Sequence, residues 1–162
     1  MSTLRRRAAG DALDVLSADH KAVMQLLAEF DELAAEEAGA AERQSLANRI
    51  CQALTAHAIG TEDVFYPALR DALQDDDLID DAEAEHDSLR ALVEQIESLD
   101  ARDERFDALV MMLGRAVARH AWQEEGVLFP RVRDTGLDLR RLGQRIARRR
   151  DEALVLLSAE AD

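Results

Sequence analysis

The stretch that decides the fold reads His120-Ala121-Trp122-Gln123-Glu124-Glu125-Gly126-Val127-Leu128-Phe129-Pro130, and it places a histidine and a carboxylate four residues apart. Residues four apart lie one turn apart on the same face of a helix, so His120 and Glu124 point in the same direction. The apolar residues around them indicate that this face is buried. Burying a polar group without a partner costs roughly 2–7 kcal/mol, and a charge costs more. A metal ion would compensate this cost, and we expect further ligands elsewhere in the chain.

The composition indicates an all-α fold. The chain of 162 residues is most simply one domain with a real hydrophobic core. It is rich in Ala, Leu, Glu and Arg, only 4% of its residues are aromatic, and it has two prolines. These residue types favour helices over sheets.

The charge distribution argues against a nucleic-acid partner. Residues 11–130 contain 28 Asp and Glu but only nine Lys and Arg, a balance of −19, whereas both ends of the chain are basic. Such an acidic body repels nucleic acid.

No apolar run approaches the ~20 residues of a membrane span. The single cysteine, Cys51, fits a reducing compartment, and no apolar segment follows the N-terminal arginines as in a signal peptide, so we expect a cytoplasmic protein.

Apolar residues spaced by three and four predict five helices. The first runs from Asp11 to about Gly39, the second contains His57 and is limited by Pro67, and the fifth, with a weaker pattern, spans about 137–158. The third and fourth are expected at about 79–99 and 106–127. We therefore predict a flexible basic leader over 1–10, a helical bundle over 11–135, and a C-terminal helix and tail over 136–162.

The chain also contains an internal repeat. Residues 57–71 align without gaps on residues 120–134, with seven of fifteen positions identical. The helices around His20 and His86 match more weakly. The bundle is therefore expected to consist of two helical hairpins related by a pseudo-twofold axis.

Each of the four bundle helices carries one histidine on its apolar stripe, and the chain has no other histidine. His20 and His86 lie early in their helices, and His57 and His120 lie late. Short loops make neighbouring helices antiparallel. At 1.5 Å per residue, all four imidazoles therefore fall at roughly the same level, at one end of the bundle. Imidazole together with carboxylate suits iron, zinc or manganese.

These motifs resemble the hemerythrin-like (HHE cation-binding) family over residues 11–135. The resemblance rests on four motifs: Asp19-His20-Lys21, His57 followed by Glu62-Asp63 and Tyr66-Pro67, Glu85-His86, and His120-x3-Glu124-Glu125-x3-Phe129-Pro130. It implies an up-down antiparallel four-helix bundle, here with an additional C-terminal helix. It also implies a non-haem di-iron centre, with two irons per chain held by histidines and two bridging carboxylates. By motif position, the ligands carried over are His20, His57, His86, His120 and Glu124.

The chain departs from the family pattern at Thr61, where the family usually has a carboxylate four residues after the second histidine. We predict that Glu62 replaces it, with Glu125 as the alternative. Glu62 is turned about 100° from position 61 on an ideal helix, but Gly60 would ease a π-bulge that turns Glu62 inward. The other interpretation is a surface Glu62, with Thr61 bonded to its own backbone.

A second departure is Ala82, where oxygen-carrying members of the family have another histidine. A smaller ligand set leaves positions open to a small ligand, which favours reactivity over reversible carriage. Tyr66 could place a phenol near the metals, but its repeat partner is Phe129, so we favour a packing role.

The resemblance implies a protein that binds dioxygen, peroxide or nitric oxide, with peroxide decomposition as an open question. Two alternatives remain. One is a non-catalytic metal-binding protein for iron homeostasis or sensing. The other is a mononuclear or zinc structural site, which Thr61 makes more plausible.

Overall fold

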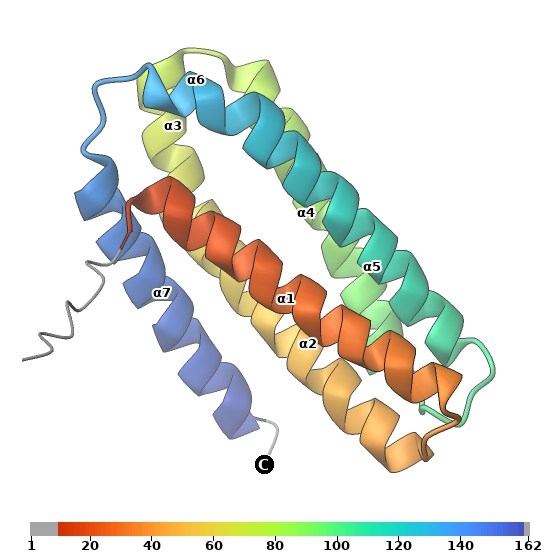
Figure 1. The fold of residues 1–162 in the computed structure, drawn as a ribbon. Coiled ribbons are helices and arrows are strands. Elements are labelled where there is room, and N and C mark those ends of the chain that lie inside the picture. Colours follow the sequence, from red (N-terminus) through yellow and green to blue (C-terminus); the bar gives the residue numbers. More distant parts are fainter. Residues whose placement is uncertain (1–9, 161–162) are drawn as a thin grey trace, which may run out of the picture.

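The computed structural model describes residues 10–160, and all their regular structure is helical (Figure 1). The elements are α1 (Ala12–Ala35), α2 (Ala40–Gly60), η1 (Thr61–Phe65), α3 (Tyr66–Leu73), α4 (Asp76–Glu97), α5 (Phe106–Gln123), η2 (Glu124–Leu128), α6 (Phe129–Arg133) and α7 (Leu139–Glu160). The all-α prediction is confirmed. None of the described helices is long and apolar enough to cross a membrane. The predicted leader lies outside the described residues, except for Gly10.

Two π-helical segments extend two of the long helices. η1 joins α2 to α3, and η2 joins α5 to α6, with helical backbone angles on both sides of each junction. Pro67 and Pro130 lie in the first turn after each segment, where a missing N–H is tolerated. The bulge predicted after Gly60 is confirmed, and its repeat has a second one.

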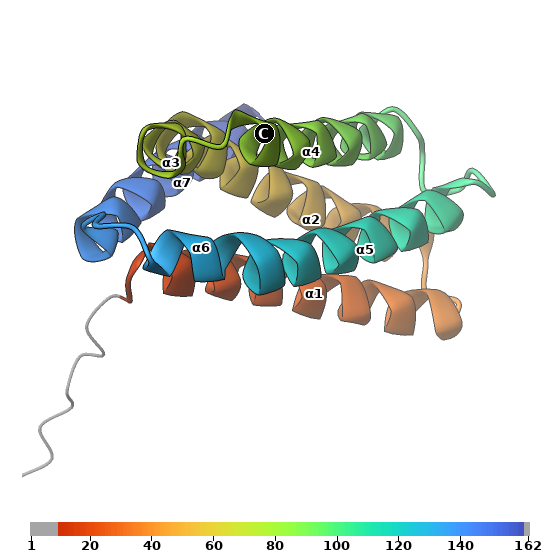
Figure 2. The ribbon, with the colours of Figure 1, turned by 90° about the horizontal axis from the view of Figure 1, so that it is seen from above.

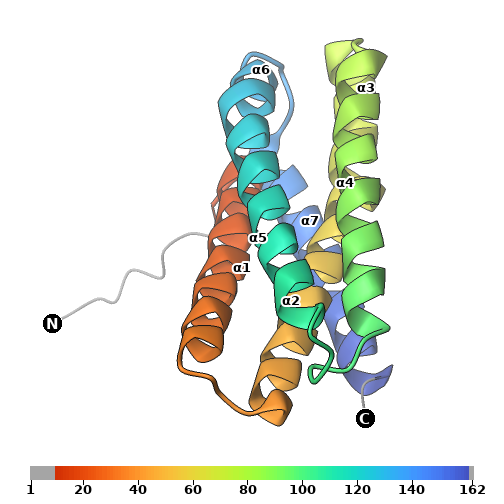
Figure 3. The ribbon, with the colours of Figure 1, turned by 90° about the vertical axis from the view of Figure 1, so that its right-hand side faces the viewer.

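Four helices form a closed antiparallel bundle. α1 packs against α2 and α5, and α4 packs against the same two helices. Figure 2 shows α1 and α5 along one layer. Figure 3 shows that the α1–α2 and α4–α5 loops lie at one end, whereas α3 and α6 lie at the other. This is the predicted up-down arrangement.

The last helix, α7, packs outside the bundle against α1 and α2 (Figure 1). Leu142 and Ile146 on this helix are buried, and Gly143 lies close to the backbone of Ala12. A methyl group on Gly143 would come within 2.8 Å of the Ala12 nitrogen, so a larger residue would push α7 away. The predicted additional helix is therefore present and is tightly packed.

The core has two apolar clusters with the histidines between them. One cluster runs from Val23 on α1 to Val117 on α5, and the other contains Leu16, Val64 and Leu128. Each histidine lies between members of the two clusters along its own helix. The expectation that the histidines lie at one end of the bundle is therefore wrong. The π segments continue the helices and add a second apolar layer beyond the histidines.

The end of α1 also differs from expectation. The helix ends at Ala35, and the left-handed residue after it is Glu37, with φ 54°, rather than Gly39. The backbone N–H of Ala38 donates to the carbonyl of Leu33 at 2.9 Å, which closes a Schellman turn. A non-glycine residue can take this position at a cost of about 1–2 kcal/mol.

Candidate metal centre

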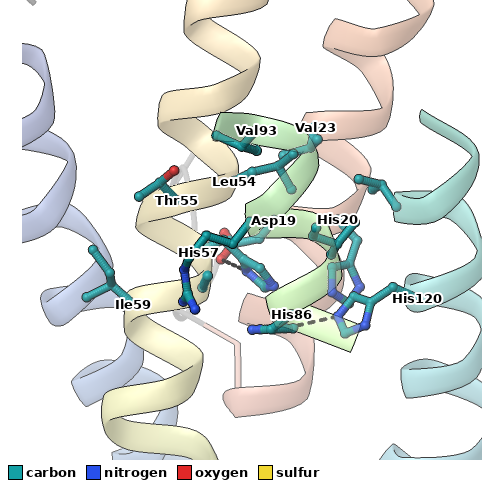
Figure 4. Close-up of a pocket in the computed structure, with 14 residues that line it drawn as sticks. Asp19, His20, Val23, Leu54, Thr55, His57, Ile59, His86, Val93 and His120 are labelled. Atoms are coloured by element: carbon teal, nitrogen blue, oxygen red, sulfur yellow. Dashed lines mark hydrogen bonds and ion pairs between the residues drawn. The ribbon is translucent and has the colours of Figure 1, made fainter. Parts of the chain in front are cut away.

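The four histidines meet in the middle of the bundle, one from each of α1, α2, α4 and α5 (Figure 4). Ring centroids are 5.0 Å apart for His20 and His57, 5.5 Å for His20 and His120, 4.8 Å for His86 and His120, and 6.1 Å for His57 and His86. All four side chains are buried. The prediction that the imidazoles share one level is confirmed.

Glu124 joins this group from the start of η2. Its Oε2 lies 3.2 Å from His120 Nε2, and its Oε1 lies 3.5 Å from His20 Nε2. Glu124 is only 3% exposed. One ligand atom from each of His20, His57, His120 and Glu124 falls within 4.8 Å of the others. This group offers three nitrogens and one oxygen, a donor set that suits iron, zinc or manganese.

The donor atoms are left without protein partners, which is the state expected of metal ligands. Buried polar atoms are nearly always hydrogen-bonded, so each exception needs an explanation. Within residues 10–160, the buried side-chain atoms that lack a hydrogen-bond partner are Nδ1 and Nε2 of His20, Nε2 of His57, Nδ1 of His86 and Oε1 of Glu124. Four of these atoms belong to the group of His20, His57 and Glu124 with His120, and the fifth belongs to the adjacent His86. A bound cation would satisfy those that face it.

His86 and Tyr66 form the far side of the centre. The Nε2 of His86 lies 3.3 Å from the Nε2 of His120 and 3.2 Å from the Tyr66 hydroxyl. The hydroxyl donates to Glu124 Oε2 at 3.0 Å. The assignment of Tyr66 to packing alone is therefore wrong. Its repeat partner, Phe129, lacks a hydroxyl, and this difference was the available signal, because a buried tyrosine hydroxyl needs a partner.

The structure does not bring Glu62 into the four-residue group. Its carboxylate accepts two hydrogen bonds from Arg90 Nη2, at 2.7 and 3.0 Å, and lies 4.0 Å from His86 Nδ1. Thr61 donates to the carbonyl of His57 at 2.8 Å, the self-bonding expected of the alternative interpretation. The role of Glu62 as a ligand stays a prediction.

Glu125, the alternative carboxylate, lies at the edge of the centre. Its Oε2 is 3.5 Å from His20 Nδ1, and its side chain is 40% exposed. It therefore faces solvent more than the buried Glu124 does.

Two acidic residues orient histidines from outside the group. Asp19 Oδ2 lies 2.8 Å from His57 Nδ1, and Glu85 Oε2 lies 3.0 Å from His120 Nδ1. A carboxylate on Nδ1 fixes the imidazole and leaves Nε2 as the free nitrogen. The sequence motifs did not indicate these roles, although both acids immediately precede the histidines His20 and His86 in the sequence.

Within the centre, a protonated His120 is paired with an ionised Glu124. Burial works against the charge of His120, but the hydrogen bonds and charges of Glu124 and Glu85 outweigh it and raise the pKa of His120 to about 9. Burial alone would raise the pKa of Glu124, but the adjacent histidines, chiefly His120, hold it well below its usual range. Burial and the neighbouring His57 lower the pKa of His20 to about 4, so His20 is neutral at pH 7.

Metal binding is therefore expected to strengthen as the pH rises from 7 to 9. The pKa of His120 is about 9 in the folded, metal-free chain and ~6.5 when unfolded. Protonated His120 thus stabilises the folded, metal-free chain fully below pH ~6.5, and this stabilisation is lost as the pH rises through about 9. A metal must displace this proton, so zinc affinity should rise about tenfold per pH unit.

Chelator competition at pH 7, 8 and 9 measures this dependence. Glu85→Gln, which weakens the support of the His120 charge, should flatten it. An affinity that stays constant across this range would contradict the proton competition.

An apolar cavity of about 170 Å³ opens onto the histidines (Figure 4). Six branched aliphatic side chains form much of its wall, and Arg90 and Asp19 add charged groups. The six are Val23, Leu54, Ile59, Leu89, Val93 and Val117. For comparison, an apolar cavity of ~150 Å³ binds benzene or xenon. The space therefore accepts a diatomic molecule or a peroxide beside the histidines.

Comparisons with known proteins agree with this fold. The sequence model of the hemerythrin HHE cation binding domain matches residues 11–153. The fold resembles the crystal structure of a hemerythrin HHE cation binding domain-containing protein from Mycobacterium kansasii, with a TM-score of 0.73 and 23% identity, covering 90% of this chain and 88% of that one. No curated protein matches the chain. Because the family model covers most of the sequence, the chain belongs to the hemerythrin HHE cation-binding domain family.

Proposed function

We propose that this chain is a cytoplasmic non-haem di-iron protein that binds dioxygen, peroxide or nitric oxide. The observation that carries the proposal is the buried group of His20, His57, His120 and Glu124, whose ligand atoms lie within 4.8 Å of one another and whose histidines line an apolar cavity. Membership of the hemerythrin HHE family supports a cation at this place.

The donor atoms fit two cations better than one if the peripheral side chains take part. His86, Tyr66 and Glu62 lie on one side of the central group, and Glu125 lies on another. When bound, iron would supply a Lewis acid and a redox couple for a small oxygen or nitrogen ligand. Glu124 faces both His20 and His120, so it would hold the metal together with these two histidines.

Residues of the chain itself would control which small molecules reach the centre. The aliphatic wall of the cavity favours a small, weakly hydrated molecule. Tyr66 holds one oxygen of Glu124 through its hydroxyl, at 3.0 Å. If the protein decomposes peroxide, two hydrogen peroxide molecules would yield two waters and one dioxygen, so no external reductant is needed.

A mononuclear zinc site is the second candidate, and one observation favours it. The central group contains four ligand atoms, the usual number for structural zinc. Arg90 already holds Glu62, and Thr61 is bonded to its own backbone. In that case the site would be structural rather than reactive.

Metal analysis of protein produced with iron, together with its near-ultraviolet and visible spectrum, separates the two candidates. About two irons per chain with an oxo-bridge absorption support the first. One zinc per chain with no visible absorption would refute the di-iron candidate. Peroxide consumption that persists in His120→Ala would show that catalysis does not occur at this centre.

Filling the cavity should block the ligand without removing the metal. Val93 is buried and lies with Val23 and Leu54 above the histidines (Figure 4). The phenyl ring of Val93→Phe would occupy the cavity. A ligand could then bind only by forcing the ring into the packed core, which costs about 1–3 kcal/mol. We expect azide or nitric oxide to bind the iron-loaded variant about tenfold more weakly, as followed by absorbance titration.

Val93→Ile, which adds a single carbon, is the control and should bind close to the wild-type level. Unchanged ligand affinity in Val93→Phe, at full metal content, would show that the ligand does not use this cavity.

A further inference from the structure

The C-terminal helix reaches the metal centre through one arginine. Arg150 on α7 donates through Nη1 to Asp19 Oδ1 at 2.7 Å, and Oδ2 of the same carboxylate lies 2.8 Å from His57 Nδ1. Asp19 therefore uses both oxygens, one toward the arginine and one toward the histidine. Figure 4 shows Asp19 beside His57 at the wall of the cavity. The chain of contacts runs from α7 through α1 to α2.

The pseudo-twofold repeat supplies an internal comparison. Glu85 occupies the equivalent place on the other hairpin and lies 3.0 Å from His120 Nδ1. Across residues 10–160, Glu85 has no arginine or lysine within ion-pair distance. The side chain of Glu85 is 32% exposed, against 12% for Asp19. Of these two equivalent carboxylates, Asp19 is therefore the one that is largely enclosed and paired with an arginine.

The packing of α7 makes this contact possible. A methyl group on Gly60, three residues after His57, would lie 3.1 Å from the carbonyl oxygen of Ile146 and 3.4 Å from Arg150 Cβ. The absence of a side chain at position 60 thus lets α7 approach α2 beside the histidine. Ile146 and Ala153 on either side of Arg150 are buried, which fixes the register of the helix.

The physical consequence concerns the orientation of His57. The Asp19 carboxylate is largely buried. Without a cation beside it, turning toward solvent would lower its free energy. The Nδ1 atom of His57 would then lose its partner, and the ring could rotate or change tautomer. Partners that orient a ligating histidine typically affect metal affinity 10–100-fold.

We propose that Arg150 is a positioning residue that holds His57 in its metal-binding orientation through Asp19. The proposal rests on the proposed function in one respect, namely that His57 binds a metal. It makes α7 part of the metal centre rather than an appendage of the bundle.

The test compares Arg150→Ala with Arg149→Ala in the full chain. Arg149 is the matched control, because it sits next to Arg150 on α7 but pairs with the exposed Asp63, at 2.9 Å. Zinc affinity is measured by chelator competition, and the melting temperature is measured with and without zinc. We expect Arg150→Ala to bind zinc about tenfold more weakly and Arg149→Ala to bind like the wild type. Arg150→Lys, which keeps the charge, should recover most of the affinity.

A double-mutant cycle with Asp19→Asn separates positioning from stability. If Arg150 acts through Asp19, adding Arg150→Ala to Asp19→Asn causes little further loss of zinc affinity. Independent, additive losses would overturn the proposal. So would an Arg150→Ala protein that melts lower but binds zinc as the wild type does. A wild-type chain that binds no metal would instead refute the proposed function itself.

Discussion

Glu124→Ala is expected to weaken metal binding by more than about 100-fold, beyond the loss typical of a residue that only orients a ligand. Glu124 is the single carboxylate in the central four-residue group and is 3% exposed. Its two oxygens face His20 and His120, at 3.5 and 3.2 Å. Removing it leaves three imidazoles and no negative charge to balance a divalent cation. The metal-free chain would also lose one of the two carboxylates, Glu124 and Glu85, that hold the proton of His120.

Metal content after purification and chelator competition both measure this loss. Asp63→Ala is the matched control, because Asp63 is an exposed carboxylate of η1 that pairs with Arg149 at 2.9 Å, and it should retain metal. Glu124→Gln keeps the shape and removes the charge, so it reports the electrostatic part alone. If Glu124→Ala kept the wild-type metal affinity, the group of His20, His57, His120 and Glu124 would not be the metal site.

The same assay decides the role of Glu62. A ligand at position 62 predicts a loss of affinity close to that of Glu124→Ala. A carboxylate engaged only with Arg90, at 2.7 Å, predicts a small one.

The level of the histidines could be predicted because it depends only on local geometry. Helical spacing puts each imidazole on a buried stripe, and loop length sets the antiparallel order. These two quantities placed His20, His57, His86 and His120 in one layer, as observed. Their position along the bundle could not be derived in this way. It depends on how far the helices continue beyond Thr61 and Glu124, and the π segments and the prolines after them decide that length.

Contacts between side chains on different helices were the least predictable part of the centre. Arg90 reaches Glu62 from α4, and Arg150 reaches Asp19 from α7, across 131 positions in the sequence. No spacing rule connects such residues. In the run Arg148-Arg149-Arg150, Arg149 pairs with Asp63 and Arg150 pairs with Asp19, both on other helical segments.

The repeat was informative where its two copies differ. Gly60 replaces the equivalent Gln123, and this glycine admits α7. Tyr66 replaces Phe129, and its hydroxyl reaches Glu124. In both cases the copy near His57 has a feature that the copy near His120 lacks. The same copy has Thr61 where the other has the carboxylate of Glu124, so the two halves of the centre are not equivalent.

Loading with metal is expected to raise the melting temperature by about 8–16 °C. The metal-free centre leaves five buried polar atoms without hydrogen bonds within residues 10–160, and a cation stabilises only the folded arrangement. At free metal 1,000 times the dissociation constant, binding contributes about 4 kcal/mol, and for a chain of this size each kcal/mol is worth about 2–4 °C.

Calorimetry with and without a metal buffer measures this difference. Glu124→Ala should show almost no increment, whereas Arg149→Ala should show the full one, because Arg149 pairs with Asp63 away from the centre. The metal-free wild type is itself expected to melt below a variant in which the buried polar atoms are removed together, since apolar replacements avoid their desolvation cost. Equal melting temperatures for the loaded and metal-free wild type would mean that the centre binds no cation. The cluster would then be a buried polar network in which five atoms lack a hydrogen-bond partner within the described residues.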